Sequence, residues 1–229
     1  MQYWLIMPAA GSGRRFGAAV PKQYLSLAGK TVIEHALAPF LADARCRQIV
    51  VAIHPADTTF QMLPPARDAR LRTVAGGEQR CDSVRNALLG IDGAVDDWVL
   101  VHDAARPCLS AAELSALLTE CGSDDVGGLL AAPLSDTLKR GDAQQRVVAT
   151  TPRDSLWRAL TPQMFRLGLL RDSLLAAQAA GRQPTDEAQA VEWRGHAPRL
   201  VAGRAANLKI TSPADLPLAA AVLAQGELG

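Results

Sequence analysis

The chain has 229 residues, of which 48% are hydrophobic and 21% are charged, and its formal net charge is +1. This length and composition predict a soluble globular protein with a large core, and we expect residues 1–229 to form a single domain. The near-neutral charge excludes a basic field over the whole surface, so we expect neither nucleic acid nor a membrane as a partner. An anionic ligand would have to bind to a local cluster of cations.

The four cysteines are scattered along the sequence, with no C-x-x-C pair. This spacing argues against a zinc site and against a disulfide framework, and it favours a reducing compartment. The opening stretch, MQYWLIMPAA, lacks a basic segment, and its apolar run is too short for a signal peptide or a membrane span. We therefore expect a cytoplasmic protein.

Short apolar runs alternate with helical stretches, which is typical of a mostly parallel sheet flanked by helices. The runs are continuous, as in strands that are buried on both faces. The expected strands are residues 3–8, 48–54, 72–75, 98–102, 128–133 and 198–203. The expected helices are residues 31–42, 82–91, 110–122, 162–181 and 212–226. The pattern predicts an α/β fold.

The first expected strand leads into a glycine-rich loop, PAAGSGRRFG. The loop does not fit the dinucleotide fingerprint G-x-G-x-x-G, because Gly11 and Gly13 are followed by Phe16 where the third glycine belongs. His54 also stands at the end of the second expected strand, where that class of protein needs an acidic residue for the ribose. A nicotinamide-dependent oxidoreductase is therefore disfavoured.

The run AGKT at residues 28–31 resembles the end of a Walker A loop. Its first glycine would have to stand where Tyr24 is, so the match fails. Thr31 followed by Glu34 is instead a capping-box pattern, which predicts that a helix begins here. A nucleoside triphosphatase of the Walker type is disfavoured as well.

The loop keeps the features of a phosphate site without matching either motif. Its glycines allow a close approach of the backbone to an anion, and Arg14, Arg15 and Lys22 supply positive charge. This combination suits a triphosphate better than a neutral ligand. The alternative interpretation is a basic loop exposed to solvent.

A second candidate site is WVLVHDAARP, where an apolar strand ends in Asp103. Ligands of open α/β sheets bind outside the carboxyl ends of the strands, so Asp103 and the glycine loop should face one crevice. A carboxylate there could hold Mg²⁺ together with phosphate oxygens, although a turn or helix-capping residue is the alternative. The histidines show no metal-ligand spacing, and we assign none of them to catalysis.

Residues 135–153 break the alternation of strands and helices. DTLKR and QRVVATT are strand-like and flank the polar turn GDAQ, so this stretch predicts a projecting hairpin. An isolated hairpin is only marginally stable in water. We therefore expect this arm to pack against another surface, such as a second subunit.

A series of motifs runs through the chain: PAAGSGRRFG with PKQY, GGEQRCDSV, VHDAARP, DTLKR, WRALTPQ, TDEA and NLKITSPADL. In this order they resemble the motifs of the 2-C-methyl-D-erythritol 4-phosphate cytidylyltransferases, from about residue 3 to about residue 225. The resemblance implies a Rossmann-like nucleotidyltransferase fold with a projecting β-hairpin arm. It also implies an enzyme of the non-mevalonate isoprenoid pathway, which uses CTP and Mg²⁺ to attach CMP to methylerythritol phosphate and releases pyrophosphate.

The same resemblance implies roles for single residues in the nucleotide half of the site. The implied nucleotide-binding residues are Ala9, Ala10, Gly11, Gly13, Gly77, Ser83 and Asp103. Arg15, Lys22 and Lys209 would act in catalysis, and Asp103 would also bind Mg²⁺. Ala206 departs from the family, which often has an acidic residue before Asn207.

For the second substrate, the resemblance implies that Arg106, Thr137 and Arg153 receive methylerythritol phosphate. The last two belong to the arm at 135–153, which the family exchanges across a homodimer. Two alternatives stay open: a cytidylyltransferase for another polyol phosphate, such as ribitol 5-phosphate, and a nucleotide-binding protein without catalytic turnover.

Overall fold

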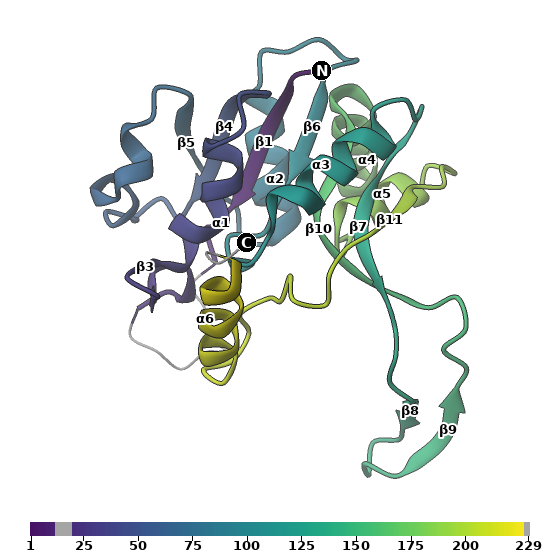
Figure 1. The fold of residues 1–229 in the computed structure, drawn as a ribbon. Coiled ribbons are helices and arrows are strands. Elements are labelled where there is room, and N and C mark those ends of the chain that lie inside the picture. The colour runs from purple at the N-terminus through teal and green to yellow at the C-terminus, as the bar shows by residue number, and fades with distance from the viewer. Residues whose placement is uncertain (12–19, 227–229) are drawn as a thin grey trace.

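The computed structural model describes residues 1–11 and 20–226, and its centre is a seven-stranded sheet (Figure 1). The strands are β1 (Tyr3–Pro8), β4 (Cys46–Ile53), β5 (Leu71–Ala75), β6 (Trp98–Val101), β7 (Gly127–Pro133), β10 (Trp157–Arg166) and β11 (Arg199–Ala202). Their order is β11-β7-β10-β6-β1-β4-β5. Only β10 among them runs antiparallel to its neighbours, β6 and β7. The predicted mostly parallel α/β sheet is confirmed.

Helices cover both faces of this sheet. They are α1 (Val32–Leu41), α2 (Arg80–Leu89), α3 (Ala111–Cys121), α4 (Leu167–Ala179), α5 (Glu187–Glu192) and α6 (Asp215–Gly226). Side chains of β1 alternate between the faces, so Leu5 and Met7 belong to one core with α1 and α3, while Trp4 and Ile6 belong to another with α2, α4 and α5. Both faces are buried, which explains why the strand reads as a continuous apolar run.

Helix α6 lies at the edge of the body (Figure 1). A third, smaller cluster joins it there, and Ala219, Val32 and Ile210 belong to this cluster. The short elements nearby are η2 (Lys22–Tyr24), β2 (Ser26–Leu27) and β3 (Lys30–Thr31), and η3 (Phe60–Met62) and η4 (Pro64–Arg67) precede β5. None of the described helices is both long and apolar enough to cross a membrane.

The capping box predicted at the start of α1 is confirmed. The Thr31 backbone N–H donates to the Glu34 carboxylate at 2.7 Å, and the Glu34 backbone N–H donates to the Thr31 hydroxyl at 3.4 Å. Two unpaired N–H groups at the helix start are thus satisfied by side chains. AGKT is therefore the entry to a helix, as expected.

The predicted helix at 162–181 is wrong in its first part. Residues 157–166 form β10, and α4 begins only at Leu167. Met164 and Phe165 point into opposite cores, so both are buried and the apolar run carries no strand alternation. Periodicity cannot distinguish such a strand from a buried helix. The six-residue helix α5 was not predicted either.

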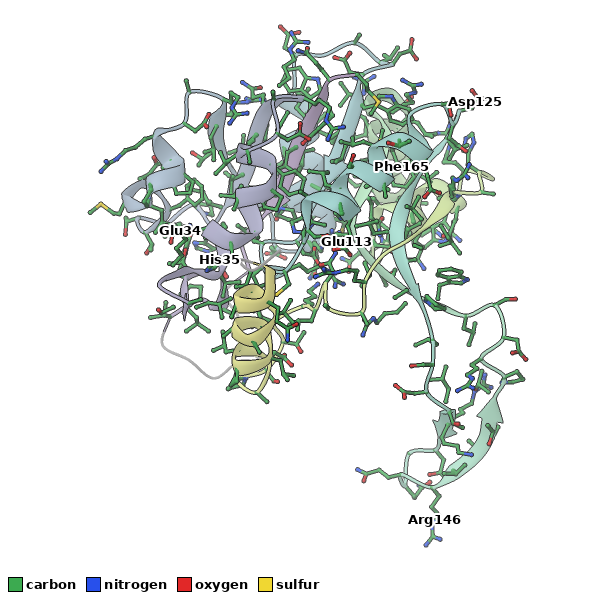
Figure 2. The ribbon with its side chains drawn as sticks, in the orientation of Figure 1. Glu34, His35, Glu113, Asp125, Arg146 and Phe165 are labelled. Carbon is green, nitrogen blue, oxygen red and sulfur yellow. The ribbon has the colours of Figure 1, made fainter. Side chains whose placement is uncertain are left out.

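The predicted hairpin within 135–153 is present as β8 (Leu138–Gly141) and β9 (Val147–Thr151), which pair antiparallel. Figure 1 shows this arm extending away from the body, beyond the ends of β7 and β10. Arg146 lies at its tip (Figure 2). Val147 and Val148 are 65% and 60% exposed, so the arm presents apolar side chains to solvent.

Candidate active site

A cleft of about 1270 Å³ opens at the carboxyl ends of β1 and β6. The chain leaves β1 to form β4 on one side and later forms β6 on the other side of β1, so the strand order reverses here. Such a switch point is where open α/β sheets bind their ligands. As expected, the described part of the glycine loop, residues 9–11, lines the same cleft as Asp103.

Most of the residues that the sequence assigned to the nucleotide come together in this cleft. The predicted residues in its lining are Ala9, Ala10, Gly11, Lys22, Gly77, Ser83, Asp103 and Lys209. Gly13 and Arg15 lie outside the described residues. Thr137 and Arg153 belong to the arm, and neither is among the described residues that line the cleft.

The described part of the glycine loop is held by the buried side chain of Gln23. Its amide nitrogen donates to the carbonyl oxygens of Ala9 at 2.8 Å and Gly11 at 3.3 Å. The opposite wall packs closely, since a Cβ on Gly76 would lie 2.3 Å from the Cβ of Ala10. Sequence reasoning quoted Gln23 within PKQY but assigned it no role; its polar side chain beside a glycine loop was the available signal.

Asp103 lies on the cleft floor among three cations. Its Oδ1 accepts from Arg80 Nε at 2.7 Å, its Oδ2 lies 2.7 Å from Lys209 Nζ, and Arg106 Nε is 3.7 Å from Oδ2. Burial alone would raise the pKa of this carboxyl, but the neighbouring charges of Arg80, Lys209 and Arg106 lower it far below its usual range. Asp103 is therefore an anion at any physiological pH.

Arg80 is a site residue that sequence reasoning missed. Its Nη1 and Nη2 donate to the two carboxylate oxygens of Glu187 at 2.7 and 2.9 Å, while its Nε donates to Asp103. Glu187 is 1% exposed. Both residues lay in quoted motifs, GGEQRCDSV and TDEA. A cation at the first residue of a helix is unfavourable because it opposes the helix dipole. Its presence there was the feature of the sequence that could have indicated a functional role for Arg80.

Below the floor, His102 and Thr161 fix the backbone of Asp103. The Thr161 hydroxyl accepts from the Asp103 N–H at 3.1 Å and lies 2.9 Å from His102 Nδ1, while His102 Nε2 lies 3.1 Å from the Arg106 carbonyl oxygen. A carbonyl can only accept, so Nε2 carries the proton and Nδ1 accepts from the hydroxyl. Burial lowers the pKa of His102 to about 4, which keeps the ring neutral.

Arg106 is buried beside Asp103, and its guanidinium donates to backbone carbonyls. Nη1 donates to the Asn207 oxygen at 2.7 Å and Nη2 to the Ala159 oxygen at 3.4 Å. The Asn207 side chain in turn donates to the Thr161 carbonyl at 2.9 Å. These bonds join the segment before Lys209 to the cleft floor. Contact of Arg106 with methylerythritol phosphate stays a prediction.

The segment that carries Lys209 is held from two further sides. Lys22 Nζ donates to the Ile210 carbonyl at 3.0 Å. At the start of α6, the Asp215 carboxylate accepts from the Thr211 and Ser212 N–H groups at 2.8 and 2.7 Å, and these bonds lower the pKa of Asp215. Lys22 and Lys209 therefore line one cleft although they are far apart in the sequence.

The mostly parallel sheet, with a cationic cleft at its switch point, defines an α/β fold of the nucleotidyltransferase type. The model of the IspD family, described as 2-C-methyl-D-erythritol 4-phosphate cytidylyltransferase, matches residues 3–225. The chain belongs to this family.

Relatives with the same description cover nearly the whole chain. A Pseudomonas putida protein named 2-C-methyl-D-erythritol 4-phosphate cytidylyltransferase is 52% identical over 217 residues, which are 93% of this chain and 92% of the relative. A Pseudomonas entomophila protein of the same name is 51% identical over the same shares. The Francisella tularensis cytidylyltransferase structure is 36% identical with a TM-score of 0.85, covering 97% of this chain and 100% of that one. The Thermus thermophilus structure is 32% identical with a TM-score of 0.81, covering 98% and 100%.

Proposed function

We propose that this protein transfers CMP from CTP to 2-C-methyl-D-erythritol 4-phosphate, giving 4-diphosphocytidyl-2-C-methyl-D-erythritol and pyrophosphate. This reaction would take place in the cytoplasm, as a step toward isoprenoid precursors. The observation that carries the proposal is the joint presence of Lys22, Asp103 and Lys209 in the cleft beside the glycine loop. Membership of the IspD family supports the identity of both substrates.

In this reaction an oxygen of the methylerythritol phosphate attacks the α-phosphorus of CTP. A new P–O bond forms, the bond to pyrophosphate breaks, and pyrophosphate leaves with the electron pair. The second pKa of a phosphate monoester is about 6, so the nucleophile is largely a dianion at neutral pH and needs no general base. The difficulty is repulsion between two polyanions, so the protein must supply positive charge and alignment.

The cleft residues fit this requirement. Lys22 and Lys209 would neutralise charge on the α-phosphoryl group and on the departing pyrophosphate, and Arg15 would join them from the loop. Backbone N–H groups of the glycine loop would face the triphosphate, while Gly77 and Ser83 would face cytosine and ribose. The Gly77 N–H already donates to the Ser83 hydroxyl at 3.1 Å, which fixes that hydroxyl at the cleft wall.

The described residues suit a magnesium ion that is shared with the nucleotide. Among residues 1–11 and 20–226, no three His, Cys, Asp or Glu side chains form a group that could hold a metal without a substrate. Mg²⁺ commonly takes one or two carboxylates and completes its shell with water and substrate phosphates, and the ionised Asp103 offers that one carboxylate. When bound, the ion would neutralise and align the phosphates.

The second substrate would be held in part by the arm of another subunit. Thr137 and Arg153 are exposed, and Arg153 donates to the Ser135 carbonyl within its own arm. Because the arm extends away from the body, we propose that it contacts the cleft of a partner in a homodimer (Figure 1). A dimer would also cover Val147 and Val148.

The function is tested by pyrophosphate release in the presence of Mg²⁺. CTP is combined with methylerythritol 4-phosphate or ribitol 5-phosphate, and ATP, GTP and UTP then replace CTP. We expect turnover only with CTP and the methylerythritol substrate. Turnover with ribitol 5-phosphate instead would overturn the assignment of Thr137 and Arg153, and no turnover with either acceptor would favour the non-catalytic alternative.

The exchange of arms is tested by mixing two inactive variants. Lys22→Ala disables the cleft and Arg153→Ala disables the arm. If the arm serves the partner, a mixed dimer contains one intact site, and random re-association should restore roughly a quarter of wild-type activity. If the arm serves its own cleft, the mixture stays inactive and the proposed exchange is wrong.

A further inference from the structure

Both carboxylate oxygens of Asp103 are engaged by cations of the protein itself. Arg80 Nε donates to Oδ1 and Lys209 Nζ contacts Oδ2, each at 2.7 Å. Asp103 is 6% exposed, so these contacts are made at the buried end of the cleft rather than in bulk solvent. A metal ion that bound to this carboxylate would have to displace one of these cations or share a carboxylate oxygen with it.

A second carboxylate, that of Glu187, holds Arg80 against Asp103, and Glu187 is itself fixed in place. Glu187 holds two guanidinium nitrogens of Arg80 in a bidentate pair. The start of α5 is itself clamped by Gln163, whose amide donates to Asp186 at 2.9 Å and accepts from the Ala188 N–H at 2.8 Å. Gln163 is fully buried in β10. The position of Arg80 is thus set before any ligand enters.

The net charge at the floor of the cleft disfavours a divalent cation that arrives without a nucleotide. Asp103 and Glu187 contribute two negative charges, and Arg80, Arg106 and Lys209 contribute three positive ones, which leaves a net +1. A divalent cation arriving alone would meet a positive surrounding and an occupied ligand. A triphosphate brings the missing negative charge and new partners for the cations.

We propose that Arg80, held by Glu187, is a built-in counter-ion that occupies Asp103 in the absence of nucleotide, so that a divalent cation binds there only together with a triphosphate. The inference rests on the proposed function, because that function makes Asp103 the metal ligand. Arg80 is in this sense a positioning residue of the metal site, and Glu187 positions Arg80.

The test measures metal binding without nucleotide. Mn²⁺ is titrated into the nucleotide-free protein, and the free ion is followed by electron paramagnetic resonance. The main variant is the double substitution Arg80→Met with Glu187→Leu, which removes both partners and leaves no unpaired buried charge. It leaves the net charge of the floor at +1 and frees Oδ1 of Asp103, so a gain in affinity reports the freed ligand oxygen and not the charge. We expect Mn²⁺ to bind at least about tenfold more tightly than to the wild type.

Two further variants locate the effect. Arg85→Met removes another cation of α2, which pairs with Asp82 at 2.8 Å, and it should leave Mn²⁺ binding at the wild-type value. Arg80→Lys keeps the positive charge and should also leave binding weak. Adding Asp103→Asn to the double variant should abolish the gain, because the ligand is then lost.

The inference is wrong if the nucleotide-free wild type binds Mn²⁺ as tightly as the double variant, or if Arg85→Met tightens binding equally. The proposed function is judged separately, by pyrophosphate release from CTP with methylerythritol 4-phosphate by the wild type. Turnover with tight metal binding to the empty wild-type cleft would overturn the counter-ion and leave the function standing.

Discussion

The cleft and the arm differ in how their side chains are held. In the cleft, Asp103 and Gln23 are buried, and partners within the same chain fix them. On the arm, Thr137, Arg153 and Val148 are exposed. The comparison shows that one chain assembles the cleft to which we assign the nucleotide, whereas the arm residues proposed to hold the acceptor are exposed and have no such surroundings within the described chain.

The largest expected effect comes from removing a cation of the cleft. Lys22→Ala should lower kcat for CMP transfer by about 10² to 10³, with a smaller rise in KM for CTP, because its charge matters most in the transition state. Steady-state kinetics measure the two parameters. A change in KM alone would contradict the catalytic role proposed for Lys22.

A smaller effect is expected on the pH dependence of stability, through the buried ring of His102 beneath the cleft floor. Burial lowers the pKa of His102 to about 4, below the roughly 6.5 of an unfolded chain, so the unfolded state binds a proton more readily between these values. The free energy of unfolding should therefore fall as the pH falls from 6.5 toward 4. His102→Gln should lose this slope, a difference of about 2 kcal/mol between pH 6.5 and 4.5.

Urea unfolding at several pH values measures this slope, and His54→Gln, a substitution at an exposed histidine, is the matched control. The control should keep the wild-type pH dependence. If His102→Gln also keeps the wild-type pH dependence, the buried ring of His102 does not cause the fall in unfolding free energy at low pH.

Thr161→Val should reduce activity without changing the shape of the cleft. Valine leaves the Asp103 N–H and His102 Nδ1 without their hydroxyl partner, at a cost of about 1–3 kcal/mol in unfolding free energy. We expect kcat to fall about tenfold, since the Asp103 backbone is no longer fixed. Thr161→Ser retains the hydroxyl and should retain most of the activity. Equal losses in both variants would assign the effect to packing instead.

The smallest effect on folding is expected on the arm. Val148 is 60% exposed, so Val148→Asp should change the unfolding free energy of the isolated chain by less than about 0.5 kcal/mol. The same change should weaken the proposed dimer, measured by analytical ultracentrifugation. An unaltered dimer would show that this face of the arm is not covered.

The sequence predicted the features that depend on neighbours along the chain. The apolar run of β1, the Thr31 and Glu34 capping box and the hairpin within 135–153 are all local patterns, and the structure has each of them. The shared crevice of the glycine loop and Asp103 followed from a rule about parallel sheets.

The features that escaped prediction depend on distant pairs. Arg80 and Glu187 are 107 residues apart, and a sequence does not show that their charges meet. The resemblance assigns Arg106 to methylerythritol phosphate, and the sequence does not show that its guanidinium donates to the carbonyls of Asn207 and Ala159. The pattern also predicts helix for residues 162–166, the second half of β10, because burial on both faces removes the strand alternation there.

The bond from Lys22 to the Ile210 carbonyl joins residues 188 positions apart, and it has a consequence for the newly made chain. During synthesis, the glycine loop and the first strands leave the ribosome long before the segment that carries Lys209. Domains fold as units once their elements are available, and long loops close late. A ribosome-bound chain that stops short of residue 209 should therefore lack one wall of the proposed nucleotide cleft, and we expect it to retain CTP less well than the full chain.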